Sequence, residues 1–345
     1  RSAENGHGLR DMRAEPDPFY MLRRGEWHNR GRQVLPNVPA VLKQEPAEFV
    51  IQKPYQDGTA SGVRLALARW LTQPDHPLTA RVMVNRAWQH FFGSGIVATA
   101  GDFGHTGTLP SHPELLDWLA VNFVQQGWSM KQLHRLVVTS EAYQQDSRSR
   151  TPASQLDPDN RLLWRMPMRR MDAETLRDSI LSLTGQVNYQ MHGSPAGVRS
   201  GGDGQVLYGP EGQGQQRSIY LLHRRSTPLT LLETFDAPRM NTNCIQRRTS
   251  TVVSQALLML NSDFSERQAT VLAAQILATN ATTPAGQLEA AYQAVLGRSP
   301  VGEENTLGIE FLENQRRRYE AVDSDPALVD LCLVLLNSAE FLYVD

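Results

Sequence analysis

The sequence predicts a mainly α, multi-helix globular domain with a small β element around residues 218–224 and an irregular N-terminal arm. Three observations support this class. Apolar residues recur at spacings of three and four in most segments after residue 61, as on one face of a helix. In residues 218–223 the side chains of Ile219 and Leu221 would face one side and those of Tyr220 and Leu222 the other, as in a strand. Prolines and arginines crowd the first 60 residues without any period.

The first 60 residues are expected to form an extended arm or linker. Seven arginines precede Gln33, and six prolines are spread over residues 16–54. Proline removes a backbone donor and restricts the residue before it, which disfavours regular structure. Residues Phe19 to Arg24 are predicted to form a short strand within this arm.

Residues 61–145 are predicted to be helical. Thr79 is the expected N-cap of the second helix, and Gly93 is its expected terminator. Ser111 and Glu114 match the S-x-x-E capping box of the third. Short connections favour antiparallel neighbours. The four predicted helices are Val63–Leu71, Ala80–Phe92, Glu114–Gln126 and Met130–Gln145.

The middle of the chain combines one helix with irregular segments. After a polar crossing, Asp172 is the expected cap of a helix over Ala173–Thr184. Residues 193–214 contain eight glycines, which predicts a long flexible loop or irregular insert. Such a loop is either a surface excursion or a functional element. Its glycines fit neither G-x-G-x-x-G nor a P-loop, so no nucleotide site is predicted.

The last third of the chain is expected to start with a strand and continue as helices. Ser218–His223 is the best strand candidate of the sequence. The predicted helices that follow are Val252–Leu260, Phe264–Ala278, Gln287–Leu296, Glu303–Tyr319 and Ala327–Leu336. We therefore expect an arm over residues 1–60 and one domain over 61–345. That domain could divide into 61–185 and 218–345 around the insert at 193–214.

The charge balance bounds the function. The 345 residues carry a formal net charge of −2, so no global field points to nucleic acid or a membrane surface. Of the 34 cations, 3 are lysine and 31 are arginine. A GC-rich genome would produce this bias, and so would anion recognition, because guanidinium binds sulfate, phosphate or carboxylate with two hydrogen bonds. No apolar run approaches the roughly 18 residues of a membrane span.

The two cysteines bind no haem. Cys244 and Cys332 belong to no C-x-x-C-H or C-x-x-C motif, so no cofactor is expected in this chain. The sequence is compatible with one disulfide between these cysteines and equally with two buried free thiols. No signal peptide precedes the arm. The chain is therefore expected to be the C-terminal part of a longer precursor.

A series of motifs carries a family resemblance. The first are "VNRAWQHFFGSGIV", "GDFG", "PSHPELLDWLA" and "GWSMKQLHRLVVTSEAYQQ". Next come "RRMDAETLRDSILSLTG", "RSIYLLHRR", "LLETFDAP", "STVVSQALLMLN" and "LNSAEFLYVD". With these motifs in this order, the sequence resembles planctomycete surface domain one, also called domain of unknown function 1553.

The resemblance implies context more than chemistry, because the activity of that family is not established. It implies an exported protein, located outside the cell, on its surface or in the periplasm. It also implies upstream domains of the same precursor as partners, among them a cytochrome c domain that would carry haem c. Similar proteins are often encoded near sulfatase-like genes, which favours an anionic glycan as ligand.

Five of the nine histidines lie between positions 76 and 134, which raises the question of a metal site. The candidate ligands are His90, Asp102, His105 and His112. Zinc or iron would need three or four such groups to converge, and their spacing matches no known ligand pattern. The competing interpretation is that His90 and His112 hydrogen-bond near helix ends. We therefore predict no metal.

A second, arginine-rich set of residues is the main site prediction. The expected binding residues are Asn85, Arg86, His90, Arg169, Arg170, Asp172, Arg224, Arg225, Asp236 and Arg247. These residues could form a buried ion-pair network that joins irregular segments to helices. They could equally line an anion or sugar cleft in which Asp102 or Glu233 acts as acid or base. We expect the Asn85/Arg86 helix face, the Asp102 loop and residues 169–172 to converge.

Three functions remain open from the sequence. The favoured one is an exported structural or ligand-binding module of a cytochrome c-linked protein. The first alternative is a carbohydrate-active enzyme or glycan-binding domain that acts on sulfated or otherwise anionic polysaccharide. The second alternative is an oxidoreductase domain coupled to an upstream cytochrome c. No G-x-S-x-G or Cys/His nucleophile pattern narrows the choice.

Overall fold

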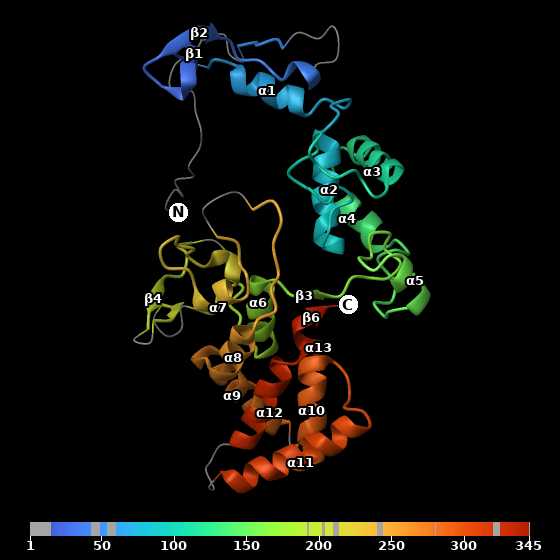
Figure 1. Cartoon of the computed structure of the whole chain (residues 1–345). Coiled ribbons are helices and arrows are strands. Elements are labelled where there is room, and N and C mark those ends of the chain that lie inside the picture. Colours follow the sequence, from blue (N-terminus) through green and yellow to red (C-terminus); the bar gives the residue numbers. More distant parts are fainter. Residues whose placement is uncertain are drawn as a thin grey trace. The chain divides into compact units, whose positions relative to one another are not determined.

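The described residues form thirteen α-helices and three two-stranded antiparallel sheets, so the predicted mainly α class is confirmed (Figure 1). The computed structural model describes residues 15–42, 49–53, 60–191, 193–201, 204–209, 214–239, 244–279, 281–319 and 325–344. The chain divides into two compact units: Arg1–Gln144 with Asp157–Leu162, and Gln145–Leu156 with Leu163–Asp345. The domain bounds expected from the sequence stay predictions.

A β-hairpin occupies the described start of the first unit. Strand β1 (Phe19–Leu22) pairs with β2 (Arg30–Val34), with Phe19 opposite Val34. A short 3-10 turn leads out of β1, where Gly25 adopts a φ of 74° that a side chain would disfavour. The strand predicted at Phe19–Arg24 is therefore present. Residues 1–14, 43–48 and 54–59 of the predicted arm lie outside the described residues.

Four helices of the first unit begin within one residue of their predicted starts. They are α1 (Val63–Leu71), α2 (Thr79–Phe92), α3 (Pro113–Gln125) and α4 (Met130–Val138). Helix α2 packs against α3 and α4. Its aromatic face is buried, with the rings of Trp88 and Phe92 stacked 4.3 Å apart. Burial of this face is what holds the three helices together.

The starts of α2 and α3 use histidine where the sequence predicts hydroxyl caps. Thr79 does not cap α2; instead Nδ1 of His76 accepts from the amides of Leu78 and Thr79, at 3.2 and 3.1 Å. The predicted capping box of α3 is absent, because the Ser111 hydroxyl lies 2.9 Å from Nδ1 of His112. His76 thus supplies the acceptor at the start of α2, whereas no side chain caps α3.

Helix α4 ends at Val138 rather than at the predicted Gln145. The hydroxyls of Thr139 and Ser140 donate to carbonyls of the preceding turn, at 2.8 and 2.6 Å. Such side-chain bonds compete with the helical backbone pattern. Two hydroxyl residues in succession therefore stop the helix although the apolar period continues beyond them.

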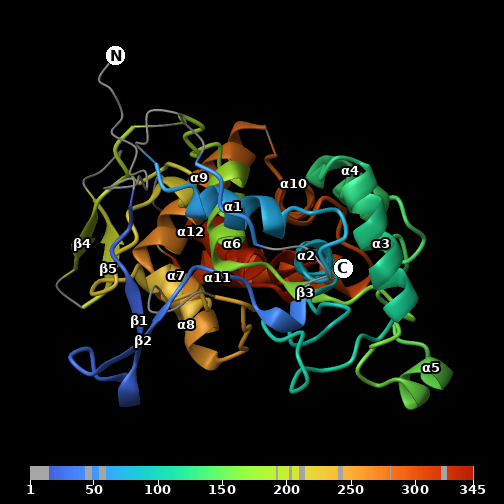
Figure 2. The same cartoon turned by 90° about the horizontal axis from the view of Figure 1, so that it is seen from above.

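Helix α12 (Pro326–Leu336) lies at the centre of the second unit (Figures 1 and 2). It buries Leu328, Leu331 and Leu335, with other residues of its length. Its neighbours are α8 (Val253–Asn261), α9 (Asp263–Ala278), α10 (Pro284–Leu296) and α11 (Glu303–Arg318). The remaining helices are α5 (Thr151–Leu156), α6 (Ala173–Leu183), α7 (Thr230–Thr234) and α13 (Ala339–Leu342).

The two ends of the second unit meet in a short sheet. Strand β3 (Arg169–Arg170) pairs antiparallel with β6 (Tyr343–Val344). The pairing places Arg170 directly ahead of α6, which starts three residues later. Helix α6 packs against α7 and α9, so its first turn is held by the core on one side and faces polar segments on the other.

The strand predicted at Ser218–His223 is wrong. Residues Ser218–Tyr220 form a 3-10 helix, and only Leu221 makes a bridge, to Ala196. The cause is Asp178, whose carboxylate accepts from the amide and the hydroxyl of Ser218 and turns the backbone there. Strands appear instead in the glycine-rich insert, where β4 (Val198–Ser200) pairs with β5 (Val206–Tyr208).

Both cysteines are free thiols: Cys332 is buried in α12 and Cys244 is exposed. The disulfide that the sequence left open is therefore not formed. Burial raises the pKa of the Cys332 thiol to about 12. None of the described helices has the length and apolar character needed to span a membrane.

Candidate functional site

Arg170 anchors a buried polar cluster of the second unit. Its guanidinium donates to Asp236 at 2.9 Å and to the carbonyl of Phe235 at 3.0 Å. Ser250 completes the cluster, since its amide and hydroxyl both donate to Asp236. The Arg170 side chain is only 4% exposed. Two predicted binding residues, Arg170 and Asp236, thus join β3, the end of α7 and the segment before α8.

Arg177 anchors a second cluster and is completely buried. Its guanidinium donates to Asp178 at 3.0 Å, to the carbonyl of Gln216 at 2.9 Å and to the carbonyl of Gly214. It also lies over the ring of Tyr208, 4.2 Å from the centroid. One side chain of α6 therefore fixes the end of the glycine-rich insert.

An open hollow of about 690 Å³ lies beside α6, here called the polar groove. Arg247 reaches across it and binds both carboxylate oxygens of Glu174, at 2.6 and 3.1 Å, with Asp172 3.6 Å away. Burial opposes ionisation of Glu174, but the Arg247 contact outweighs it and lowers the pKa of Glu174. The lining residues are Asp172, Glu174, Thr175, Asp178, Ser179, Ser182, Val187, Tyr189, Arg217, Ser218, Ile219, His223 and Arg247.

A smaller hollow of about 310 Å³ adjoins the polar groove, here called the arginine groove. The two share His223. Glu233, a predicted acid or base, lies here and pairs with Arg239 at 3.3 Å. The lining residues are His223, Arg224, Arg225, Pro228, Leu229, Leu232, Glu233, Ala237, Pro238 and Arg239.

Among the described residues, five arginines and four carboxylates line the two grooves; the polar groove has three carboxylates and two arginines, and the arginine groove has three arginines and one carboxylate. Arg239 and Arg247 each have a carboxylate partner, Glu233 and Glu174. Within the described part of the chain, no carboxylate pairs with the side chains of the three remaining arginines: Arg217, Arg224 and Arg225. All three are exposed. The arrangement is suited to attract anions, since guanidinium groups bind them with directed hydrogen bonds.

In the first unit, Asn85 proves to be a structural residue. It is fully buried, and its amide donates to the carbonyl of Val97 and accepts from the amide of Val97, at 3.0 and 2.8 Å. It thereby fixes the loop that follows α2. Arg86 and His90, on the same helix, are exposed.

Asp102 is committed to its own loop. Its carboxylate accepts from the amide of Gly104 at 2.8 Å and from the hydroxyl of Thr106 at 2.7 Å. These hydrogen bonds lower the pKa of Asp102. His105 is exposed on the same loop. Among the described residues no three or more histidine, cysteine or acidic side chains are placed to hold a metal ion.

Within the first unit, the Asn85 side of α2 contacts the loop that contains Asp102, as predicted. Arg169 to Asp172 belong to the other unit. Their proximity to Asn85 stays a prediction. In the second unit, Asp172 meets Arg247, and Arg224 and Arg225 lie in one groove with Glu233.

Three basic residues of the grooves were not predicted: Arg217, His223 and Arg239. A usable signal for two of them was the segment "RSIYLLHRR", in which basic residues flank a short apolar run on both sides. If the backbone turns within residues 218–222, the basic residues on both sides of them lie on the same surface. Arg239 had no such signal, because only the fold of residues 233–239 brings it to the groove.

Acid is expected to weaken the Arg170 cluster through Asp236. Burial alone would raise the pKa of Asp236, but hydrogen bonds from Ser250 and Arg170 outweigh it and lower that pKa. A depressed carboxyl pKa stabilises the fold above the unfolded value of about 3.9, and this stabilisation is lost as the pH falls through the folded value. The stability difference between the wild type and Asp236→Asn should therefore shrink between pH 7 and pH 3 in urea unfolding. An unchanged difference would contradict this assignment.

Comparison with known protein families gives a match over residues 63–312. The matching family is described as PSD1: Protein of unknown function (DUF1553). Comparison with curated proteins and with solved structures gave no match.

Proposed function

Because the chain belongs to the PSD1 family (DUF1553), whose description names no activity, we propose a function from its own surface: a glycan-binding module that holds an anionic polysaccharide. The polar groove and the arginine groove form the binding surface. The observation that carries the proposal is the set of three exposed arginines, Arg217, Arg224 and Arg225, without carboxylate partners among the described residues.

The shape of the surface supports a chain-like ligand. The two grooves share His223 in their linings, and the polar groove is the more open of the two. A sulfated or carboxylated polysaccharide carries one acidic group on each repeat or on every second one. Charges spaced along a track suit such a ligand, because each guanidinium can bind a separate acidic group.

Polar and aromatic groups of the polar groove suit the sugar rings. Thr175, Ser179 and Ser182 offer hydroxyls on one face of α6. The ring of Tyr189 is 65% exposed and the side chain of Ile219 is 75% exposed at the same groove. An exposed aromatic ring can stack on the apolar face of a sugar, and hydroxyls can pair with its hydroxyl groups.

We propose binding rather than glycoside hydrolysis. A glycosidase needs two carboxyl groups about 5–10 Å apart that face the substrate. The two acids expected for that role already have partners, Asp102 within its loop and Glu233 on Arg239. Glu174 is likewise held by Arg247 in a two-point contact.

We also propose that this module works outside the cytoplasm as part of a longer, cytochrome c-linked protein. The support is the family resemblance alone. Haem c would belong to another domain, because neither Cys244 nor Cys332 lies in an attachment motif. An oxidoreductase role would require electron transfer from that domain. The described residues of the two grooves give no support for such a role.

The test is a binding measurement with matched polymers. Dextran sulfate and polygalacturonate should bind the wild type at low salt, and neutral dextran should bind much more weakly. Arg224→Ala/Arg225→Ala should weaken binding by about tenfold at low salt, with a smaller difference at high salt, since exposed charge contacts are modest and screened. The matched control is Arg317→Ala/Arg318→Ala, a pair of exposed neighbours on α11.

The control separates a local site from general attraction to cations. If both double variants lose the same affinity, binding is non-specific and the proposal is wrong. Equal binding of dextran and dextran sulfate would also contradict it. All variants should unfold at the urea concentration of the wild type, because the substituted side chains are exposed.

A further inference from the structure

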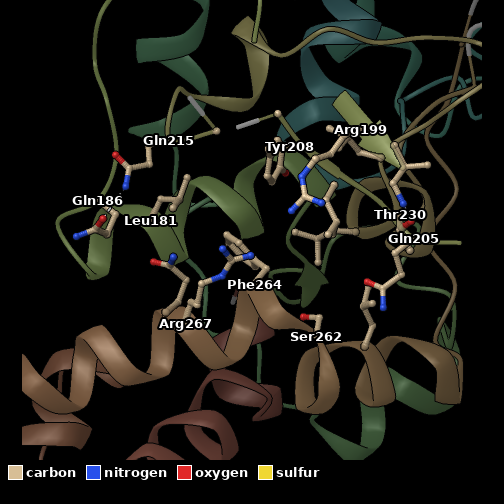
Figure 3. Close-up of a pocket in the computed structure, with 18 of the residues that line it drawn as sticks. Leu181, Gln186, Arg199, Gln205, Tyr208, Gln215, Thr230, Ser262, Phe264 and Arg267 are labelled. Atoms are coloured by element: carbon tan, nitrogen blue, oxygen red, sulfur yellow. Dashed lines mark hydrogen bonds between the residues drawn. The ribbon is translucent and has the colours of Figure 1, made fainter. Parts of the chain in front are cut away.

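A separate hollow lies between the glycine-rich insert and helices α8 and α9, here called the insert cavity (Figure 3). Its volume is about 470 Å³, within the roughly 300–1,000 Å³ of small-molecule sites. It shares no lining residue with the polar groove and only Leu229 with the arginine groove. A ligand in the insert cavity is therefore independent of the proposed glycan-binding function.

The insert forms a defined wall of this cavity. The amide of Val206 in β5 donates to the Thr230 hydroxyl at 2.8 Å, which ties the hairpin to α7. Gly214 closes against Tyr208: a Cβ at Gly214 would lie 2.5 Å from the Cβ of Tyr208. Since real side chains do not approach so closely, this position requires glycine. The abundance of glycine in the insert thus has a structural use at the cavity.

Most of the surface inside the cavity is apolar, with a few fixed polar groups. Leu181, Leu258 and Val271 contribute to the apolar part. Gln215 donates its side-chain amide to that of Gln186 at 2.6 Å. The hydroxyl of Tyr208 is buried with no hydrogen-bond partner among the described residues. Burial raises the pKa of Tyr208 to about 12, so this hydroxyl remains a neutral donor at neutral pH.

Two arginines point into the cavity from different walls, Arg199 from β4 and Arg267 from α9 (Figure 3). Arg267 donates its Nε to the carbonyl of Asp263 at 3.0 Å, which leaves its terminal amino groups for other contacts. Neither guanidinium pairs with a carboxylate of the described chain. None of the described lining residues is acidic.

Arg199 and Arg267 are both exposed, so water solvates them without a ligand, and an anion between them could form charge-assisted hydrogen bonds with both. A neutral ligand would leave both guanidinium groups without a counter-charge, and an inorganic ion would leave the apolar part of the cavity unfilled. The lining is therefore complementary to a molecule with an acidic group at one end and an apolar body at the other.

We infer that the insert cavity binds a small organic anion, with its carboxylate or sulfonate-type group between Arg199 and Arg267 and its body on Leu181, Leu258 and Val271. The ligand class is thus an organic acid with an apolar body of about the size of a substituted naphthalene.

Calorimetric titration of the full chain tests this inference. The probes are naphthalene-2-sulfonate and glucuronate, with naphthalene-2-sulfonamide as the neutral counterpart of the first. One equivalent of an anionic probe should bind, and the neutral counterpart should bind at least about tenfold more weakly, as expected for the loss of charge-assisted hydrogen bonds. Naphthalene-2-sulfonate should bind more tightly than glucuronate, because only its body is apolar, and a preference for glucuronate would contradict the assignment of the apolar part.

Variants locate the site. Arg199→Ala and Arg267→Ala should each weaken binding of the anionic probe by about tenfold without shifting the urea midpoint, because both side chains are exposed to the cavity mouth. Arg317→Ala, on α11 and outside the lining of all three hollows, is the control and should bind the probe like the wild type. Equal binding of the charged and neutral probes, wild-type affinity in both cavity variants, or no binding of either anion would overturn the inference.

Discussion

Replacing Arg177 with methionine is expected to lower the free energy of unfolding by about 3–5 kcal/mol, the usual cost of breaking a buried charge pair from one side. Its side chain has no exposed surface and donates to Asp178, Gln216 and Ser218. Methionine fills much of the volume but donates nothing. The carbonyls of Gly214 and Gln216 would then lose a buried donor. Urea unfolding followed by circular dichroism measures the loss.

Arg217→Ala is the matched control for Arg177→Met. It lies in the same polar segment, but its side chain is exposed and has no carboxylate partner in the described residues. Its effect on stability should stay within about 0.5 kcal/mol. If Arg177→Met is as stable as this control, the buried cluster does not hold the insert as described.

Asn85→Ala is expected to cost about 2–4 kcal/mol in the first unit. The substitution removes both hydrogen bonds to the backbone of Val97 and leaves a buried amide and a buried carbonyl without partners. Each such group costs about 1–3 kcal/mol. Loss of protection at Val97 in hydrogen exchange, together with urea unfolding, reports the effect.

The neighbouring residue provides the control for Asn85→Ala. Arg86 is on the same helix and exposed, so Arg86→Ala should leave both the stability and the exchange at Val97 unchanged. A large loss in anion binding by either variant would restore the view that this helix face is a binding site. Equal stability of the two variants would show that the Asn85 contacts contribute nothing.

The helices could be predicted from the sequence because their signals are local. Helix α6 illustrates this, since its apolar residues recur with the helical period; Asp172 occupies the predicted N-cap position, but its side chain does not make the predicted capping hydrogen bond. The segment Ser218–His223 shows the limit of such signals. Its alternation predicts a strand, but a distant carboxylate, Asp178, turns the backbone at Ser218. Tertiary contacts overrode the local preference there.

The sequence predicted several residues of the candidate site, but it did not predict which of them stabilise the fold and which are free to bind a ligand. The sequence predicts Arg170, Arg224 and Asn85 as binding residues alike, because the residue type alone does not show whether an arginine or asparagine is buried. The fold separates them: Arg170 and Asn85 are buried and make contacts that stabilise the fold, whereas Arg224 is exposed in a groove. The insert cavity had only one sequence signal, the glycine-rich stretch, which does not reveal which side chains line it.

The most direct measurement for the division between structural and binding arginines is a crystal structure of the full chain with a sulfated oligosaccharide. The expected result is that sulfate oxygens lie within hydrogen-bond distance of Arg217, Arg224 or Arg225, while Arg170 and Arg177 keep their protein partners. Density for the oligosaccharide on another face, with these three arginines in contact with solvent alone, would contradict the assignment.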